Sequence, residues 1–204
     1  MNTKERIIKE ALYLFAEKGY GAVSVAEIAK AVGIKAPSLY KHYKSKQDIF
    51  DAILVEMSKR YDKQAASMQM HGTNANMDVS LFTNIDENML LELGKSLFLY
   101  FLHDEYVCQF RKMLTIEQYH NQDLSKLYTK QYHDDPISYQ EMMFTLLGKD
   151  KGSSEQTNIM ALQFYAPIFI LLTLCDRDPS REEEALLMIE KHIKQFNCLY
   201  RKVL

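Results

Sequence analysis

Residues 24–46 read SVAEIAKAVGIKAPSLYKHYKSK, a pattern that predicts two short helices joined by a tight turn. Ser24 is a good N-cap, and Glu27 completes a capping box in which each side chain satisfies a free backbone N–H group. Gly33 ends the first helix, because the residue just past a helix often adopts the left-handed conformation that glycine tolerates. Pro37 begins the second helix, since its missing N–H group and preset φ suit the first turn. Such a unit presents one helix to a partner.

The second helix has few apolar residues and therefore leaves most of its surface free. Only Leu39 and Tyr43 are apolar partners at i, i+4. The remaining side chains are cations and hydrogen-bond donors, namely Lys35, Ser38, Tyr40, Lys41 and His42. In a helix-turn-helix, such a face suits the major groove of DNA, where the first turn reaches base edges and flanking donors hold phosphates. The alternative is an ordinary helical hairpin with a solvated polar face.

The helix that follows favours the DNA-binding interpretation. Ser45 can cap this helix, and Asp48 lies at its third position. Lys46 lies at its N-terminus, where free N–H groups and the helix dipole favour an anion such as phosphate. Charge is also uneven, since residues 1–60 hold 11 Lys and Arg against 7 Asp and Glu, while the remainder holds 14 against 20. A basic N-terminal region on an acidic chain suits a polyanion.

Three segments together resemble the DNA-binding domain of the tetracycline-repressor (TetR) family of bacterial transcriptional regulators. They are IIKEALYLFAEKGY at residues 7–20, SVAEIAKAVG at residues 24–33 and LYKHYKSKQDI at residues 39–49. The last is the most specific, being similar to the family pattern L-Y-x-H-F-x-[NS]-K-x-x-L with Tyr43 and Ile49 as mild departures. The resemblance implies an all-α protein with a helix-turn-helix DNA-binding domain at residues 1–47 and a helical effector-binding and dimerisation domain at residues 48–204.

Position in the motif suggests a role for each candidate DNA-binding residue. The start of the recognition helix would meet base edges, and positions that match the family pattern would bind phosphates. Lys41 can add a phosphate or base contact, and Ser24 is a weaker candidate because its capping role already explains it. The candidates for base edges are Lys35, Ala36, Pro37 and Ser38, and those for phosphates are Tyr40, His42 and Lys46.

The rest of the chain predicts further helices and carries no strand signal of any length. Residues 66–86 turn polar and lose periodicity, and we interpret them as the inter-domain boundary, part helix end and part loop. Helical patterns then recur, and the expected elements are helices near residues 90–102, 107–114 and 137–147, a loop at 148–154, a helix capped by Ser153 that runs to about Cys175, and a last helix after residue 180.

The last two helices are interpreted as a dimerisation surface. Their apolar residues recur at three and four positions, like the seam of a bundle, although the same pattern could simply close the core of one monomer. The TetR resemblance extends to YAPIFILL at residues 165–172 and EKHIKQF at residues 190–196, and members of that family dimerise through their last two helices. The expected interface residues are Ile168, Leu172, Leu186, Ile189, Ile193 and Phe196. A two-fold dimer would read a palindromic DNA site.

The resemblance also implies a cavity for a small effector in the helical domain. Methionine and aromatic side chains on the relevant helices suit an apolar or aromatic ligand, although they could equally be plain core. The expected lining residues are Phe98, Phe101, Met113, Met142, Phe144, Tyr165 and Phe169. The expected function is therefore that of a regulator, in the first place a repressor, which such an effector releases from its operator. The alternative is a helical DNA-binding activator without an effector.

An enzymatic reading rests on two histidine-aspartate runs. His103-Asp104 and His133-Asp134-Asp135 superficially resemble metal-dependent HD-type phosphohydrolases, but a metal site needs more ligands, and His120 with Asp123 is the only nearby candidate. The chain has no G-x-S-x-G, Walker, C-x-x-C or H-E-x-x-H motif. We therefore expect no enzyme, metal or cofactor.

A cytoplasmic protein without a membrane partner is also expected. The N-terminus MNTKERIIKE is charged and helical in pattern, unlike a signal peptide. No run of about 18 apolar residues occurs, and the most apolar stretch, residues 165–175, reads as a buried helix segment.

Overall fold

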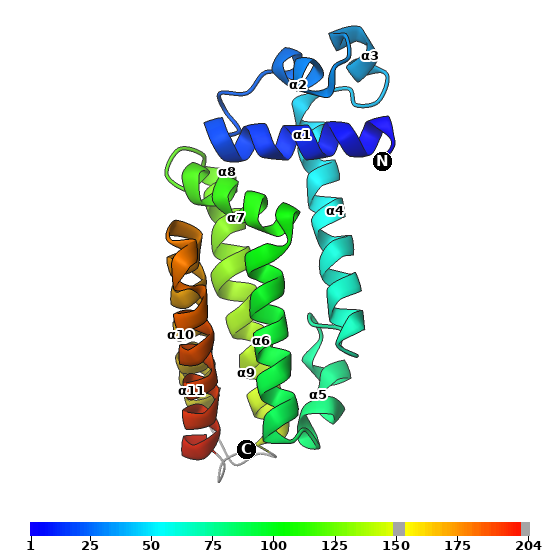
Figure 1. Ribbon diagram of the computed structural model, residues 1–204. Coiled ribbons are helices and arrows are strands. Elements are labelled where there is room, and N and C mark those ends of the chain that lie inside the picture. Colours follow the sequence, from blue (N-terminus) through cyan, green and yellow to red (C-terminus); the bar gives the residue numbers. More distant parts are fainter. Residues whose placement is uncertain (149–153, 201–204) are drawn as a thin grey trace. The chain divides into compact units, whose positions relative to one another are not determined.

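The computed structural model describes residues 1–148 and 154–200, and within these ranges every regular element is a helix or helical turn (Figure 1). The all-α fold class predicted from the sequence is therefore confirmed. The loop expected at 148–154 and the Ser153 cap fall almost wholly on residues 149–153, which lie outside the described residues. Contacts divide the chain into two compact units, Met1–Tyr61 with Glu105–Thr129 and Asp62–Asp104 with Lys130–Leu204. This division differs from the expected boundary after residue 47, because helices from the middle of the chain belong to the N-terminal unit.

The N-terminal unit is built first on α1 (Thr3–Lys18), α2 (Val25–Val32), α3 (Ala36–Tyr40) and the beginning of α4 (Lys46–Ser67). α1 packs on α2, and α2 packs on α3. Each helix has an apolar face at helical spacing that removes it from water. The fully buried side chains on these faces are Ile7, Leu12, Phe15, Ile28, Leu39, Ile49 and Ile53.

Two later helices, α7 (Glu105–Glu117) and α8 (Gln122–Thr129), complete this unit. α7 packs along α1. At the start of α7, Glu105 lies 3.0 Å from the ammonium of Lys9 and accepts a hydrogen bond from the Tyr13 hydroxyl. At its end, the buried Glu117 carboxylate accepts a hydrogen bond from the Gly21 N–H group at 3.4 Å. Polar contacts at both ends of α7 thus fix its position along α1.

The second unit contains α5 (Ala75–Thr83), α6 (Glu87–His103), α9 (Asp135–Leu147), α10 (Ser154–Arg177) and α11 (Glu182–Tyr200). A π-helical turn at Lys130–Asp134 precedes α9, and a 3₁₀ turn at Pro179–Arg181 precedes α11. α5 lies inside residues 66–86, where we expected no further helix. The core-facing positions of α5 include Ala75 and Asp78, so no stripe of large apolar residues marks this helix in the sequence.

Most of the residues expected at the dimer surface are core residues of this unit, which corrects the prediction. Ile168 and Leu186 are only partly buried, yet they pack against the same cluster as the others. That cluster contains Leu172, Ile189 and Ile193 with Leu91 and Phe98 of α6, and Phe196 joins a second cluster around Phe144. The helical spacing had left this alternative open, because a seam between two chains and a seam within one chain have the same period.

The outer faces of α10 and α11 carry a different set of apolar residues. Ile170 is 63% exposed and Leu187 is 54% exposed. The others are Ile159 and Leu162 on α10 and Met188 and Leu199 on α11. By length and mean hydropathy alone, residues Gln156–Arg177 could also span a membrane, which we did not expect from the sequence. The opposite face of α10 is buried in protein through Met160, Ala161 and Cys175, among others.

Gly19 provides a test of how α1 ends. This residue has φ 86° and ψ 150°, and an added Cβ would lie 2.6 Å from the Oε1 atom of Glu117. We expect Gly19→Ala to lower the free energy of unfolding by about 1–3 kcal/mol, because this backbone region is accessible almost only to glycine and the carboxylate would have to move. The change is measured by urea denaturation.

Gly21→Ala is the matched control for this substitution. An added Cβ at Gly21 meets no atom within 4 Å. The control should therefore unfold within about 0.5 kcal/mol of the wild type. Equal stability of the two variants would contradict the proposed strain at Gly19.

Candidate nucleic-acid interface

α2 begins at a capping box, as the sequence predicts. The Ser24 hydroxyl accepts a hydrogen bond from the Glu27 N–H group at 3.2 Å, and the Glu27 carboxylate accepts one from the Ser24 N–H group at 2.9 Å. These hydrogen bonds and the ammonium of Lys18, 3.2 Å away, lower the pKa of Glu27 to about 2. The carboxylate is therefore ionised at neutral pH, where it fixes the start of the helix.

The turn between α2 and α3 depends on Gly33. Its φ of 77° and ψ of 30° place it in the left-handed region. The Gly33 N–H group donates to the Lys30 carbonyl at 3.0 Å, and the Ile34 N–H group donates to the Ala29 carbonyl at 2.9 Å. This pair of hydrogen bonds is a Schellman motif, which closes the end of α2 and sets the direction of the chain into α3.

α3 is a five-residue helix with Pro37 in its first turn, and the fully buried Leu39 anchors it. The predicted base-edge and phosphate residues lie on one continuous stretch around it. Lys35, Pro37, Tyr40 and Lys41 are exposed, and Ala36, Ser38 and His42 are half-buried. The helix ends at Tyr40, earlier than the sequence pattern suggested, so Lys41 and His42 lie in the turn that leads to α4.

The cap of α4 has the predicted partners. The Ser45 hydroxyl accepts from the Asp48 N–H group at 3.0 Å, and the Asp48 carboxylate accepts from the Lys44 N–H group at 3.0 Å. Hydrogen bonds from the Ser45 hydroxyl and the Lys44 backbone lower the pKa of Asp48. The N-terminus of α4 is therefore fixed close to the recognition segment.

Lys46, for which we predicted a phosphate contact, binds backbone carbonyl groups of the protein. Its Nζ atom donates to the carbonyl oxygens of Tyr20 at 2.8 Å, Val23 at 2.9 Å and Gly21 at 3.4 Å. The same atom lies 4.5 Å from the centre of the Tyr20 ring. An ammonium group has three N–H donors. The three carbonyl partners all belong to the loop before α2. We call this set of contacts the Lys46 clamp.

Sequence reasoning missed two residues that position the motif. Arg6 of α1 donates a hydrogen bond to the Val32 carbonyl at the end of α2. The ring of Tyr20 packs edge-on against Phe15, with centroids 5.0 Å apart, and against Phe50 at 5.3 Å. Tyr20 lies in the segment at residues 7–20 that resembles the TetR pattern, and this resemblance could have identified it. Arg6 has no such signal, because its partner is a backbone group 26 residues away.

The residues expected around an effector cavity are divided between the two units, and most of them pack against other side chains. Met113 is fully buried in the N-terminal unit, and Met142 is exposed. The others lie in the second unit, where Phe98 and Phe144 belong to the core clusters, Phe101 packs against one of them, and Tyr165 stacks on Phe169 at 5.9 Å. None of the seven lines either of two cavities that lie near the end of α4.

The histidine-aspartate runs have local partners. His103 Nε2 lies 3.0 Å from the Glu182 carboxylate, and the His133 ring packs edge-on against Phe169 at 5.5 Å. His120 and Asp123 belong to the other unit and are exposed. Within residues 1–148 and 154–200, no three His, Cys, Asp or Glu side chains are grouped so that they could hold a metal ion.

These features define a class of protein. Two capped helices meet at a left-handed glycine turn, the polar face of the second helix is exposed, and this motif is part of an otherwise helical chain. That is a helix-turn-helix protein of the kind that presents α3 to the major groove of DNA.

Comparison with known proteins relates the helix-turn-helix region of this chain to one family. The sequence model described as "Bacterial regulatory proteins, tetR family" matches residues 7–53. The biofilm operon icaADBC HTH-type negative transcriptional regulator IcaR is 48% identical to this chain over 48 residues in Staphylococcus aureus and 47% identical over 47 residues in Staphylococcus epidermidis. The matches cover 24% and 23% of this chain, and 26% and 25% of those relatives.

Solved structures extend the similarity of fold to nearly the whole chain. A TetR-family transcriptional regulator from Mesorhizobium loti superposes with a TM-score of 0.67 at 18% identity, covering 97% of this chain and 96% of that one. SmeT, the repressor of the Stenotrophomonas maltophilia multidrug efflux pump SmeDEF, gives 0.61 at 15% identity, with 98% and 90% covered. Residues 7–53 thus match the tetR family of bacterial regulatory proteins, and nearly the whole chain shares the fold of these solved structures.

Lys46 allows a test of the clamp. We expect Lys46→Met to lower the free energy of unfolding by about 1–3 kcal/mol, because three loop carbonyls lose a charged donor while the apolar stem is kept. Chemical denaturation measures this change. Lys44→Met, which alters an exposed lysine two residues earlier, is the control and should have little effect. Unchanged stability together with a salt slope of DNA binding reduced by about one would instead indicate a phosphate contact.

Proposed function

We propose that this protein is a cytoplasmic transcriptional repressor that binds a palindromic operator as a homodimer and releases it when a small effector binds. The observation that carries the proposal is the helix-turn-helix, with its exposed row of donors around α3 and the family match over residues 7–53. No feature of the described residues favours a catalytic role, since the histidine-aspartate runs are engaged locally.

Each exposed residue of the recognition segment has a proposed role. Ser38, half-buried on α3, can donate or accept a hydrogen bond at a base edge, and Ala36 or Pro37 can contact a thymine methyl group. Lys35 and Lys41 are exposed cations at the two ends of the helix. We assign Lys35 to base edges and Lys41, with Tyr40 and His42, to phosphates, which fix the register of the protein on DNA. Ser24 is occupied by its cap.

The proposed dimer uses the exposed apolar faces of α10 and α11. Ile159, Leu162 and Ile170 recur on one side of α10, and Met188 and Leu199 recur on one side of α11. The two helices pack against each other, so both faces belong to one helical layer. Covering them with a second copy removes apolar surface from water. It also accounts for the membrane-like hydropathy of α10 without a membrane.

The direction of regulation is proposed from the relatives. IcaR is named as a negative regulator and SmeT as a repressor. A dimer places two recognition helices about 34 Å apart, in successive major grooves. An effector that prefers another arrangement of the dimer weakens DNA binding by its differential affinity, typically ~1–3 kcal/mol, and DNA weakens effector binding equally.

The DNA-binding proposal is tested by selecting bound fragments from random double-stranded DNA at moderate salt. We expect a palindromic consensus. Lys41→Ala should then weaken binding to all sequences and reduce the salt slope by about one, whereas Ser38→Ala should change the preferred bases. Lys112→Ala, at an exposed lysine of α7, is the control and should bind as the wild type does. A folded protein that enriches no sequence would exclude the proposed function.

The dimer is tested by measuring the mass of the protein in solution. We expect the wild type to have twice the mass of one chain and Ile170→Asp to have the mass of one, because a buried carboxylate on an apolar interface is strongly unfavourable. Val55→Asp places the same charge on α4 at a residue of similar exposure and should remain dimeric. A monomeric wild type, or a dimeric Ile170→Asp variant, would refute this interface.

A further inference from the structure

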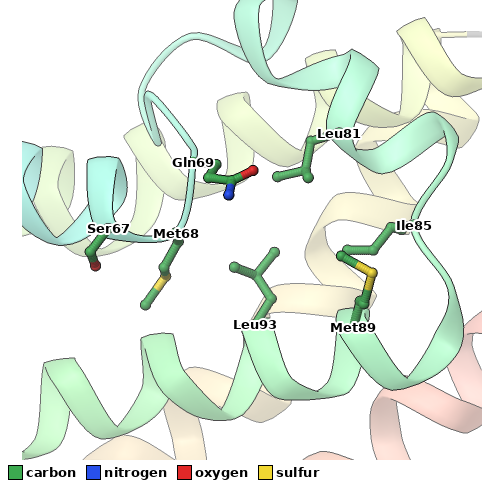
Figure 2. A pocket seen from close by; sticks show the side chains of 7 residues that line it. All are labelled: Ser67, Met68, Gln69, Leu81, Ile85, Met89 and Leu93. Carbon is green, nitrogen blue, oxygen red and sulfur yellow. The ribbon is translucent and has the colours of Figure 1, made fainter.

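A cavity of about 190 Å³ lies beside the C-terminal end of α4, within the second unit (Figure 2). α4, α5, α6 and the segment between α5 and α6 all contribute to its wall. Ser67 and Gln69 are the polar side chains of the lining. The other lining residues are Met68, Leu81, Ile85, Met89 and Leu93. All seven are uncharged, and two are methionines, whose flexible thioethers adapt to the shape of a ligand.

Gln69 has an unusual backbone for its residue type. Among the residues that the structure describes, it is the one non-glycine with positive φ, at 59°. Its N–H group donates to the Ala66 carbonyl at 3.0 Å, and the Met70 N–H group donates to the Ala65 carbonyl at 2.9 Å. This is the Schellman ending of α4, a position that glycine normally occupies. A glutamine there carries a conformational cost, and such strain points to a function of the side chain.

The side chain of Gln69 is exposed and lies at the rim of the cavity. Figure 2 shows its amide directed into the space between Leu81 and Leu93. Within the described part of the chain, this amide makes no hydrogen bond, so its donors and acceptor are available to a ligand. A second cavity, lined by Asp62, Ala66, Met70, His71 and Thr73, also includes Gln69 in its wall. Gln69 therefore lies at the boundary between the two cavities, of which the first has a mainly apolar lining and the second a more polar one.

The loop that follows Gln69 is anchored to α5 and α9 by hydrogen bonds. The buried Asp78 carboxylate accepts hydrogen bonds from the His71 N–H group at 2.7 Å, the Gly72 N–H group at 2.8 Å and the Tyr139 hydroxyl at 2.8 Å. Three donors satisfy both oxygen atoms of this buried carboxyl group. The anchored loop holds Gln69 at a fixed place at the rim.

From these features we infer that the cavity at the end of α4 binds a small, uncharged, mainly apolar molecule whose one polar group is recognised by the Gln69 amide. This inference deepens the proposed function and rests on it, in that the bound molecule is the effector. An apolar cavity of about 150 Å³ holds benzene. The cavity near α4, at about 190 Å³, is open at its rim, where Ser67, Gln69 and Met89 are exposed, and it has room for a single ring with one or two substituents.

The binding test uses three matched probes on the full-length protein. The probes are 4-methylphenol, toluene, which lacks the hydroxyl group, and 4-methylbenzoate, which is charged. With ¹³C-methyl methionine, we expect 4-methylphenol to shift the Met68 and Met89 signals to saturation and to leave Met142, an exposed residue of α9, unchanged. Toluene should bind about 3- to 10-fold more weakly, since it loses one hydrogen bond. The benzoate should give no saturable shift.

Two kinds of variant separate the cavity from the amide. Leu93→Phe fills the cavity and should abolish the saturable shifts while the thermal midpoint stays equal or rises, and Leu81→Phe serves as the second filling variant. Gln69→Gly should bind 4-methylphenol and toluene with equal affinity and unfold at an equal or higher temperature. Wild-type binding by both filled variants would overturn the site. A retained preference for 4-methylphenol in Gln69→Gly would overturn the role of Gln69.

DNA binding by the unliganded protein, measured on the same preparation, distinguishes the two proposals. Sequence-specific DNA binding without saturable methionine shifts would overturn the cavity as a ligand site and leave the regulator standing. Saturable shifts at Met68 and Met89 in a protein that enriches no DNA sequence would support the cavity and overturn the proposed function. Equal shifts at Met142 would show non-specific partitioning and overturn the site.

Discussion

The placement of the helix-turn-helix depends on the loop at residues 19–23. Two side chains of opposite charge, one on α4 and one on α7, bind backbone groups of this loop. The Lys46 ammonium of α4 donates hydrogen bonds to three carbonyl oxygens of the loop, and the Glu117 carboxylate of α7 accepts one from the Gly21 N–H group. Between them the Tyr20 ring packs against Phe15 and Phe50. A loop normally satisfies its backbone groups with water. Here the protein supplies the partners, so α1, α2, α4 and α7 share one junction, and the N-terminal unit extends to α7.

Local signals in the sequence predicted the local structure well. Ser24 with Glu27, Gly33, Pro37 and Ser45 with Asp48 act within four residues of one another, and each has the predicted role. Contacts over a long separation could not be predicted in this way. The partners of Lys46 are backbone carbonyls more than 20 residues away, and the docking of α7 on α1 joins residues nearly 100 positions apart. Backbone partners have no residue identity that a pattern could reveal.

Helical spacing also leaves the direction of an apolar face undetermined. On α11 the stripe that contains Ile189 and Ile193 faces α6 inside the unit, whereas Met188 and Leu199 are exposed on another face. A helix with two apolar faces gives no preference between its own core and a partner. The candidate effector residues stay a prediction for a related reason, because large aromatic side chains that could line a cavity can also pack in a core, as Phe144 does. The side chains that line the cavity near α4 are instead aliphatic or polar and include no aromatic ring.

The shortness of α3 has a consequence for how DNA specificity can change. A helix of five residues is far below the length at which a helix is stable in water by itself. Its conformation is therefore imposed by its surroundings, through the buried Leu39, the Gly33 turn and the fixed start of α4. Ser38 and its neighbours, the proposed base contacts, are therefore positioned by side chains that pack inside the protein. If the proposed function holds, we expect that substitution in the interior of the N-terminal unit can alter operator preference with every proposed DNA-contacting residue unchanged.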